Sequence, residues 1–131
     1  MCGALQYEVT GEPLWVAHCH CKSCRRNTGA PVATFIGFRK SGFRYLTGEP
    51  KVYHSSPGVS RSFCPTCGNP MSYESERFEG EIHIYLSTLD EPEKYQAQGH
   101  VFTKEAIPWF HIDDDLPRYP ETAGTSNPSS D

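Results

Sequence analysis

A short stretch at residues 18–26, with the sequence HCHCKSCRR, carries three cysteines at the spacing C-x-C-x2-C. Three thiolates this close together can bind one metal ion, because tetrahedral zinc accepts sulfur ligands at roughly 2.3 Å. We therefore predict a zinc site formed by Cys19, Cys21 and Cys24. Three local ligands leave a fourth coordination position free, and an open position is what distinguishes a catalytic zinc from a structural one.

The other residues of this stretch are mostly basic, and positive charge favours the ionised form of a nearby thiol. Two of them, His18 and His20, flank Cys19. Side chains alternate along an extended segment, so if Cys19 and Cys21 face the metal, both histidines point away from it. Packing or hydrogen bonding therefore explains the two histidines at least as well as ligation does.

A second motif, Cys64-Pro-Thr-Cys67-Gly68, resembles a zinc knuckle. Its glycine suits the tight turn that points backbone N–H groups at the sulfurs. One knuckle supplies only two of four ligands, so it needs partners from elsewhere, and Cys2 is a candidate. We predict a second zinc site, separate from the first, at Cys64 and Cys67, with Cys2 as the candidate third ligand.

Two other uses of the six cysteines remain open from the sequence. They could form three disulfides, but the N-terminus lacks the basic and apolar regions of a secretory leader. We therefore expect a cytoplasmic protein, in which clustered cysteines are more often metal ligands than disulfides. Cys21 with Cys24, or Cys64 with Cys67, could instead be a redox pair, although no βαβ pattern surrounds either.

Composition narrows the class of protein further. A chain of 131 residues is expected to form one domain, yet only 37% of its residues are hydrophobic and it contains 11 Gly and 11 Pro. Zinc would stabilise such a loop-rich chain, because metal-binding free energy becomes folding free energy. The net charge of −4 argues against a nucleic-acid partner, and no apolar run is long enough to span a membrane.

Apolar residues recur in short runs, which predicts a mainly β fold of many short strands. Strands are expected at residues 5–9, 14–17, 32–36, 43–46, 51–54, 59–63, 71–74 and 81–89. The turn residues at 47–50 predict that the strands on either side pair as a hairpin. Helical turns are expected only around Cys24 and at 91–96. We expect the domain to span residues 1–120, followed by a flexible polar tail at 121–131.

One tryptophan and the histidines outside the cysteine motifs are expected to have ordinary structural roles. Trp109, which follows Pro108, is expected in the core or in a pocket wall. Four histidines stand alone in the sequence and are expected to have no special role: His54, His83, His100 and His111.

Four motifs, in this order, resemble the glutathione-dependent formaldehyde-activating (GFA) or centromere-protein-V-like family: CGALQY at 2–7, CHCKSCRR at 19–26, FCPTCG at 63–68 and IPW at 107–109. The resemblance runs from Cys2 to about Tyr119. It implies a compact domain of several short coiled antiparallel β-sheets that carries two zinc ions. By motif, Cys19, Cys21 and Cys24 resemble the ligands of the family's catalytic zinc, and Cys2, Cys64 and Cys67 resemble ligands of its structural zinc.

The start of the chain departs from the family pattern. The family usually opens with C-x-C-G, whereas this sequence opens with Met1-Cys2-Gly3. The first cysteine of that pair would precede residue 1. We therefore expect an empty or partly occupied structural site with Cys2 loose at the chain end; the alternatives are ligation by the Met1 amino group or by water.

The resemblance implies a carbon–sulfur lyase that forms S-hydroxymethylglutathione from glutathione and formaldehyde. Zinc at the first site would bind and deprotonate the substrate thiol, which then reacts with the aldehyde to give a hemithioacetal. The partners implied are thus a small thiol and a small aldehyde. Two alternatives are a non-catalytic zinc-stabilised binding module and a zinc-scaffolded sulfoxide reductase, which would need a separate free cysteine.

Overall fold

A computed structural model describes residues 1–123 of the 131-residue chain. The chain divides into two compact units. The first unit comprises Met1–Leu14 and Ile36–Pro92, and the second comprises Trp15–Phe35 and the described chain from Glu93 onward. The described residues contain nine strands and one α-helix, which confirms the mainly β prediction. Of the polar tail predicted at 121–131, residues 124–131 lie outside the described part of the chain.

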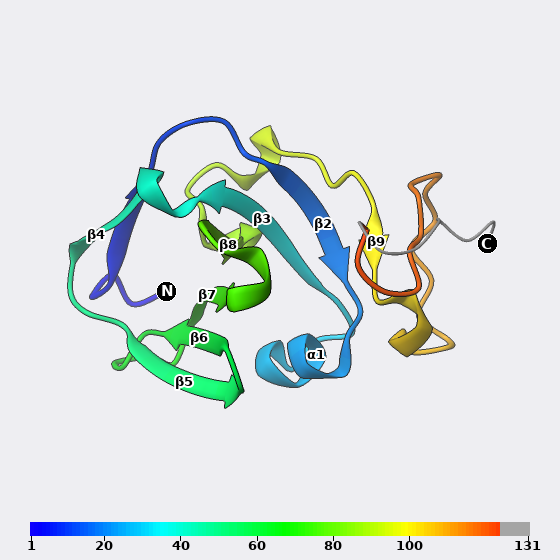
Figure 1. The fold of residues 1–131 in the computed structure, drawn as a ribbon, viewed down its shortest axis with the longest axis horizontal. Coiled ribbons are helices and arrows are strands. Elements are labelled where there is room, and N and C mark those ends of the chain that lie inside the picture. The colour runs from blue at the N-terminus through cyan, green and yellow to red at the C-terminus, as the bar shows by residue number, and fades with distance from the viewer. Residues whose placement is uncertain (124–131) are drawn as a thin grey trace. The chain divides into compact units, whose positions relative to one another are not determined.

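A two-stranded antiparallel sheet in the first unit joins β1 (Gln6–Val9) to β4 (Phe43–Thr47), shown in blue and cyan in Figure 1. Opposite side chains attract each other across this pair: Glu8 faces and ion-pairs with Arg44, and Tyr7 packs on Phe43 with ring centroids 5.2 Å apart. Such cross-strand pairs are what stabilise a sheet.

The hairpin predicted between residues 43–46 and 51–54 is therefore wrong. The turn residues at 47–50 correctly mark a change of direction, but β4 pairs with β1, while β5 (Lys51–Ser56) pairs with β6 (Val59–Phe63). The real hairpin turns at Pro57-Gly58. Gly58 has a φ of 75°, which suits the second central position of a turn that opens with proline.

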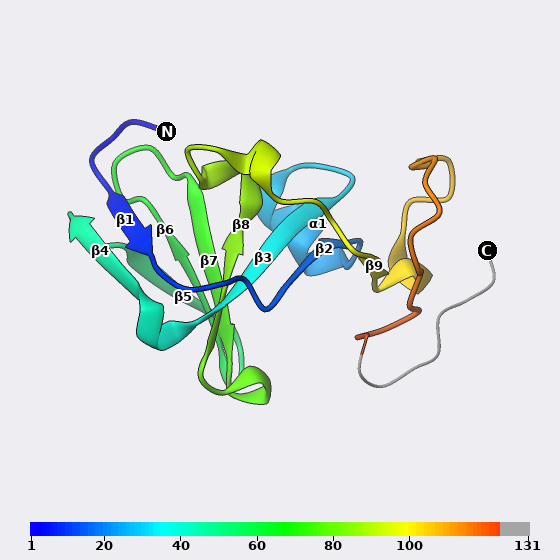
Figure 2. The same cartoon turned by 90° about the horizontal axis from the view of Figure 1, so that it is seen from above.

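The remaining strands of the first unit continue this antiparallel pairing in the order β5-β6-β7-β8, which Figure 2 shows side by side. β7 spans Pro70–Ser75 and β8 spans Glu81–Tyr85. β3 (Ala33–Arg39) begins in the second unit and ends in the first. The strand predicted at 81–89 is shorter than expected, because a 3-10 helix at Leu86–Thr88 ends it.

The core of the first unit consists of large apolar side chains from β3 and β8. Ile36, Phe38, Ile82 and Ile84 are each at most 1% exposed. Four short 3-10 helices lie between strands and a fifth follows the last strand: η1 (Lys40–Gly42), η2 (Glu76–Phe78), η3 (Leu86–Thr88), η4 (Pro92–Lys94) and η5 (Thr103–Glu105).

The second unit is built around β2 (Trp15–Cys19), the helix α1 (Lys22–Thr28) and β9 (His100–Val101). β2 and β9 run parallel, with His18 opposite His100 and Cys19 opposite Val101. The helical turns predicted around Cys24 and at 91–96 are found as α1 and η4. Trp109 was expected in the core or a pocket wall, but its side chain is 73% exposed, so that prediction is wrong.

Candidate metal centres

The first cysteine group lies where β2 ends and α1 begins. Cys19 is the last residue of β2, and Cys21 is the N-cap of α1, whose sulfur accepts a hydrogen bond from the Cys24 N–H at 3.3 Å. This strand-to-helix turn brings the side chains together: the sulfurs of Cys19, Cys21 and Cys24 all lie within 4.8 Å of one another. We call these residues the α1 thiol group.

The α1 thiol group fits a zinc ion by chemistry and spacing. Three sulfurs bound at roughly 2.3 Å to a tetrahedral ion would lie about 3.8 Å apart, a separation that the observed grouping allows. Hydrogen bonding with Cys21 and then Cys24, together with burial, raises the pKa of Cys19 well above its usual range. Three thiols held together in this way bind a proton or a cation in preference to remaining as neighbouring anions, and a metal ion favours their thiolate forms.

The second cysteine group joins the N-terminus of the first unit to the loop between β6 and β7. Cys64 and Cys67 sit on a tight turn closed by a hydrogen bond from the Gly68 N–H to the Cys64 carbonyl at 2.8 Å. Gly68 has a φ of 78°, a conformation that other residues adopt at a cost. The sulfurs of Cys2, Cys64 and Cys67 lie within 4.8 Å of one another, and we call them the knuckle thiol group.

Cys2 does not lie loose, contrary to our expectation. Its sulfur is 3.7 Å from that of Cys64, close to the separation expected for two ligands of one tetrahedral ion. Cys64 is itself 2% exposed and packs with Leu5 and Met71, so the buried end of the group is anchored in the core. Occupancy by metal stays a prediction.

The thiols of the knuckle group differ in acidity. Hydrogen bonds from the backbone N–H groups of Asn69 and then Cys2 lower the pKa of Cys67 to about 6. The Ala4 N–H would lower the pKa of Cys2 as well, but the neighbouring Cys67 thiol and desolvation outweigh it and raise that pKa. Cys67 therefore ionises more readily than Cys2, which suits a metal ligand.

The two groups use all six cysteines of the chain, and the structure contains no disulfide. The structure brings the six predicted ligands together as two trios, each of which could hold a metal ion, and zinc binding by them stays a prediction. Because no cysteine is left outside the groups, the sulfoxide-reductase alternative lacks the separate nucleophile it needs.

The positive charge expected beside the α1 thiol group is smaller than the sequence suggested. Burial, and then the nearby His100, lower the pKa of His20 to about 4 and also lower the pKa of His18, so both are neutral at pH 7. The Arg25 guanidinium donates hydrogen bonds to two backbone carbonyls, that of His20 at 3.2 Å and that of Glu105 at 2.9 Å. The exposed cations of α1 are Lys22 and Arg26.

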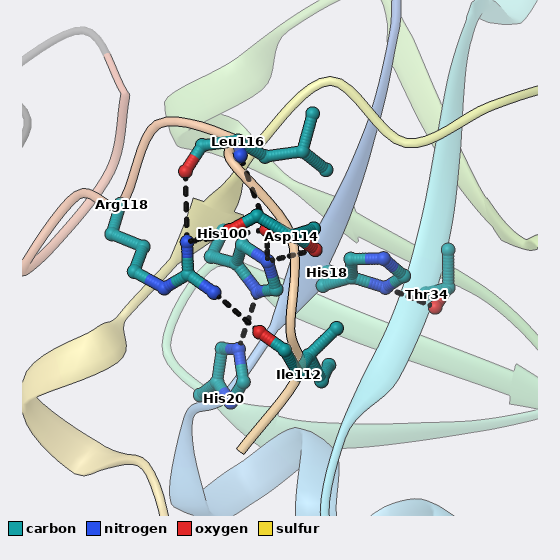
Figure 3. Close-up of polar contacts among 8 residues, drawn as sticks. All are labelled: His18, His20, Thr34, His100, Ile112, Asp114, Leu116 and Arg118. Atoms are coloured by element: carbon teal, nitrogen blue, oxygen red, sulfur yellow. Dashed lines mark hydrogen bonds and ion pairs between the residues drawn. The ribbon is translucent and has the colours of Figure 1, made fainter. Parts of the chain in front are cut away.

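A polar network joins His20, which lies between Cys19 and Cys21 in sequence, to His100 of β9 and to Asp114 in the later chain (Figure 3). The His20 Nε2 atom lies 2.9 Å from His100 Nδ1. On its other side, His100 Nε2 donates to the carboxylate of Asp114, at 2.9 and 3.1 Å from its two oxygens. His18 has a hydrogen-bond partner of its own, with its Nδ1 2.7 Å from the Thr34 hydroxyl, and its ring lies against that of His100 with centroids 4.9 Å apart.

Sequence reasoning missed this network because it treated His100 as an isolated residue. For His18 and His20 the sequence favoured packing or hydrogen bonding at least as much as ligation, and each has a polar partner of its own. His100 joins His20 only through the parallel pairing of β2 and β9, and those strands lie about 80 residues apart in the chain. A two-residue strand such as β9 leaves no periodic signal.

Comparisons with known proteins identify the family of this chain and a protein with a similar fold. The model of one protein family, described as "Glutathione-dependent formaldehyde-activating enzyme", matches residues 1–105. A crystal structure of a Rhodobacter sphaeroides protein, a structural-genomics target, is similar with a TM-score of 0.57 and 21% identity, covering 73% of this chain and 92% of that one. At that identity the likeness shows the fold alone. A search of curated proteins found no match, and no helix of the described chain is long and apolar enough to cross a membrane.

Proposed function

The chain belongs to the glutathione-dependent formaldehyde-activating family, and on this premise we propose that it is a zinc-dependent carbon–sulfur lyase. Its reaction would form or cleave the adduct of a thiol with a small aldehyde, as in S-hydroxymethylglutathione. We further propose that it works in the cytoplasm, where glutathione is the abundant small thiol.

One observation carries this proposal: the α1 thiol group brings three cysteine sulfurs together, and no fourth ligand joins them among the described residues. A structural zinc site is almost always closed by four protein ligands, whereas a catalytic site keeps one position for substrate. The group is also local. It lies within six residues of sequence, so binding metal there closes only a short segment and contributes little to holding distant parts of the fold together.

The knuckle thiol group supports the opposite role. Cys2 and Cys64 are 62 residues apart, so a metal bound there links the start of the chain to the β6–β7 loop. Linking distant segments stabilises a fold in the way that a cross-link does. We therefore assign the α1 thiol group to reactivity and the knuckle thiol group to stability.

The chemistry requires a thiol to lose its proton and attack an aldehyde. Zinc held by Cys19, Cys21 and Cys24 would supply a positive charge that lowers the pKa of the substrate thiol. A sulfur–carbon bond then forms, the carbonyl carbon–oxygen double bond becomes single, and the oxygen takes up a proton, so no oxidant or reductant is needed. The chain's own contribution is to hold three sulfurs rigidly at the start of a helix, with two of them buried.

Exposed cations on α1 support an anionic thiol as substrate. Lys22 and Arg26 are four residues apart on the helix that also carries Cys24, which places the two cations together on its exposed face, opposite the buried Cys24. Glutathione carries two carboxylates, and a cationic face raises its local concentration. A thiol without carboxylates, such as cysteamine, is therefore expected to be a poorer substrate.

The test is an exchange measurement by NMR, in which the zinc-loaded protein is added to glutathione and formaldehyde and the interconversion of free and adduct glutathione is followed. We expect the protein to accelerate this exchange, Cys21→Ser to abolish the acceleration, and Ser23→Ala, an exposed change on the same helix, to leave it intact. Acceleration by Cys21→Ser equal to that by wild type would overturn the proposal. Glutathione binding without acceleration would favour the non-catalytic binding module instead.

A further inference from the structure

The chain beyond the family match is built into the second unit. The match ends at residue 105, yet residues 117–121 lie along β9. The His100 N–H donates to the Pro117 carbonyl and the Tyr119 N–H donates to the His100 carbonyl, each at 2.8 Å. The Phe102 N–H also donates to the Glu121 carbonyl at 3.0 Å. Backbone contacts therefore hold this segment beside β9, independently of its side chains.

Within this segment, Arg118 fixes the turn that presents Asp114. Its guanidinium donates to the carbonyl of Ile112 at 2.7 Å and to that of Leu116 at 3.0 Å, and it lies 3.1 Å from Asp114 Oδ1. The Leu116 N–H donates to the same oxygen at 3.1 Å. The Asp114 carboxylate is thus oriented from both sides, and Figure 3 shows it directed at His100.

The Asp114 contact determines where the protons lie on the two histidines. Burial alone would raise the pKa of Asp114, but hydrogen bonds from His100 and the Leu116 N–H lower it, so the carboxylate is ionised and can only accept. His100 must then carry its proton on Nε2. When His100 is neutral its Nδ1 is an acceptor, so His20 donates to it from Nε2 and the His20 Nδ1 keeps a bare lone pair.

His20 is the residue between two ligands of the α1 thiol group. Its ring is 5% exposed, and its Nδ1 has no hydrogen-bond partner among the described residues. Its backbone is held as well, because its N–H donates to the Val101 carbonyl at 3.1 Å and its carbonyl accepts from Arg25. The contact with His100 therefore anchors the side chain of the one residue that separates Cys19 from Cys21.

We propose that Asp114 is a positioning residue for the α1 thiol group, acting through His100 and His20, with Arg118 holding its carboxylate. This inference rests on the proposed function in taking those thiols as the reactive site. It assigns to the chain beyond residue 105 a role that the family match does not cover. Outer partners of this kind typically change metal affinity by about 10- to 100-fold when they are removed.

The first test measures proton positions and needs no turnover. Nitrogen-15 NMR of the full-length protein labelled on histidine distinguishes a protonated ring nitrogen from a bare one. We expect His100 and His20 both to be protonated on Nε2. In Asp114→Asn, the amide can donate to His100 Nε2, so both rings are expected to shift their proton to Nδ1. A wild-type His20 protonated on Nδ1, or no shift in the variant, would overturn the proposal.

The second test measures metal binding. Cobalt(II) bound to thiolates gives intense charge-transfer absorption, and competition with a chelator then gives the affinity of the α1 thiol group. We expect Asp114→Ala to lower this affinity by about 10- to 100-fold. Asp114→Asn keeps the side-chain shape and is expected to retain more of the affinity. Asp113→Asn, an exposed neighbouring change, is the matched control and should leave it unchanged.

The outcomes separate this inference from the proposed function. If Asp114→Ala weakens cobalt binding but wild type does not accelerate adduct exchange, positioning stands and the lyase assignment fails. If wild type accelerates the exchange and Asp114→Ala binds cobalt as tightly as Asp113→Asn, positioning fails alone. If Asp114→Ala does not fold, the proton positions in wild type and in Asp114→Asn decide whether Asp114 is a positioning residue.

Discussion

Substituting Gly68 tests whether the knuckle turn sets the metal site. Gly68 has a φ of 78°, and a Cβ built there would meet no atom within 4 Å, so the substitution Gly68→Ala meets no steric clash. Its cost is the left-handed backbone alone, which is about 1–2 kcal/mol for an L-residue. The Gly68 N–H closes the turn that fixes the spacing of Cys64 and Cys67, so relaxation of this strain would disturb the sulfurs.

The matched control is Gly80→Ala. Gly80 has a φ of 81° and equally open space for a Cβ, but it lies between η2 and β8, away from the cysteines in sequence. In the zinc-loaded protein, both variants are expected to lower the free energy of unfolding by about 1–2 kcal/mol, measured by urea denaturation. Only Gly68→Ala should also weaken metal binding by the knuckle thiol group, by about 5- to 30-fold if the strain appears wholly in the metal-bound state.

The assay is chelator competition with zinc or cobalt, run on wild type and both variants. Gly68→Asn adds a discriminating arm, because asparagine tolerates the left-handed region better than alanine and should lose less affinity. Equal metal affinity in Gly68→Ala and Gly80→Ala would show that the turn does not set the positions of the sulfurs. It would refute the reasoning even if both proteins were destabilised.

Three further predictions follow from the assigned roles. Cys21→Ser is expected to remove metal from the α1 thiol group with little change in melting temperature, whereas Cys67→Ser should lower the melting temperature clearly; the reverse order would exchange the roles of the two groups. In zinc-free protein, the depressed pKa of Cys67 means that its alkylation rate should rise with a midpoint near pH 6 and level off above it. The ionised thiol stabilises the fold, and this effect is lost as the pH falls through the same value. An alkylation midpoint of about 8.5, the pKa of a free thiol, would contradict this prediction. Phe38→Ala, at a core side chain 1% exposed, is expected to cost about 3–5 kcal/mol in urea denaturation, and a loss below 1 kcal/mol would contradict its place in the core.

The sequence predicted best what is encoded locally. The strands and the turn around Cys24 follow from residue periodicity, and the α1 thiol group follows from six consecutive residues. The knuckle group was predicted from the C-x2-C-G spacing, although the close approach of Cys2 to Cys64 depends on the fold of the first unit. Such features need no knowledge of which strands are neighbours.

What the sequence could not supply were the pairings between distant segments. The turn at 47–50 carries the same residues whether or not the strands beside it pair, so β4 was assigned the wrong partner. His100 acquires its role only because β9 lies beside β2 and because Arg118 turns Asp114 toward it. Exposed Trp109 was misplaced because hydrophobicity predicts burial on average, not for a particular side chain.

Cadmium-113 NMR of the metal-substituted protein, with and without glutathione, tests the central claim most directly. The account predicts two signals in the range typical of thiolate-rich sites, because the chain holds two separate trios of sulfurs. Glutathione should shift only one of them, and that signal should be the one missing from Cys21→Ser. A single signal, or two signals that glutathione leaves unchanged, would contradict the assignment of the α1 thiol group as the reactive zinc site.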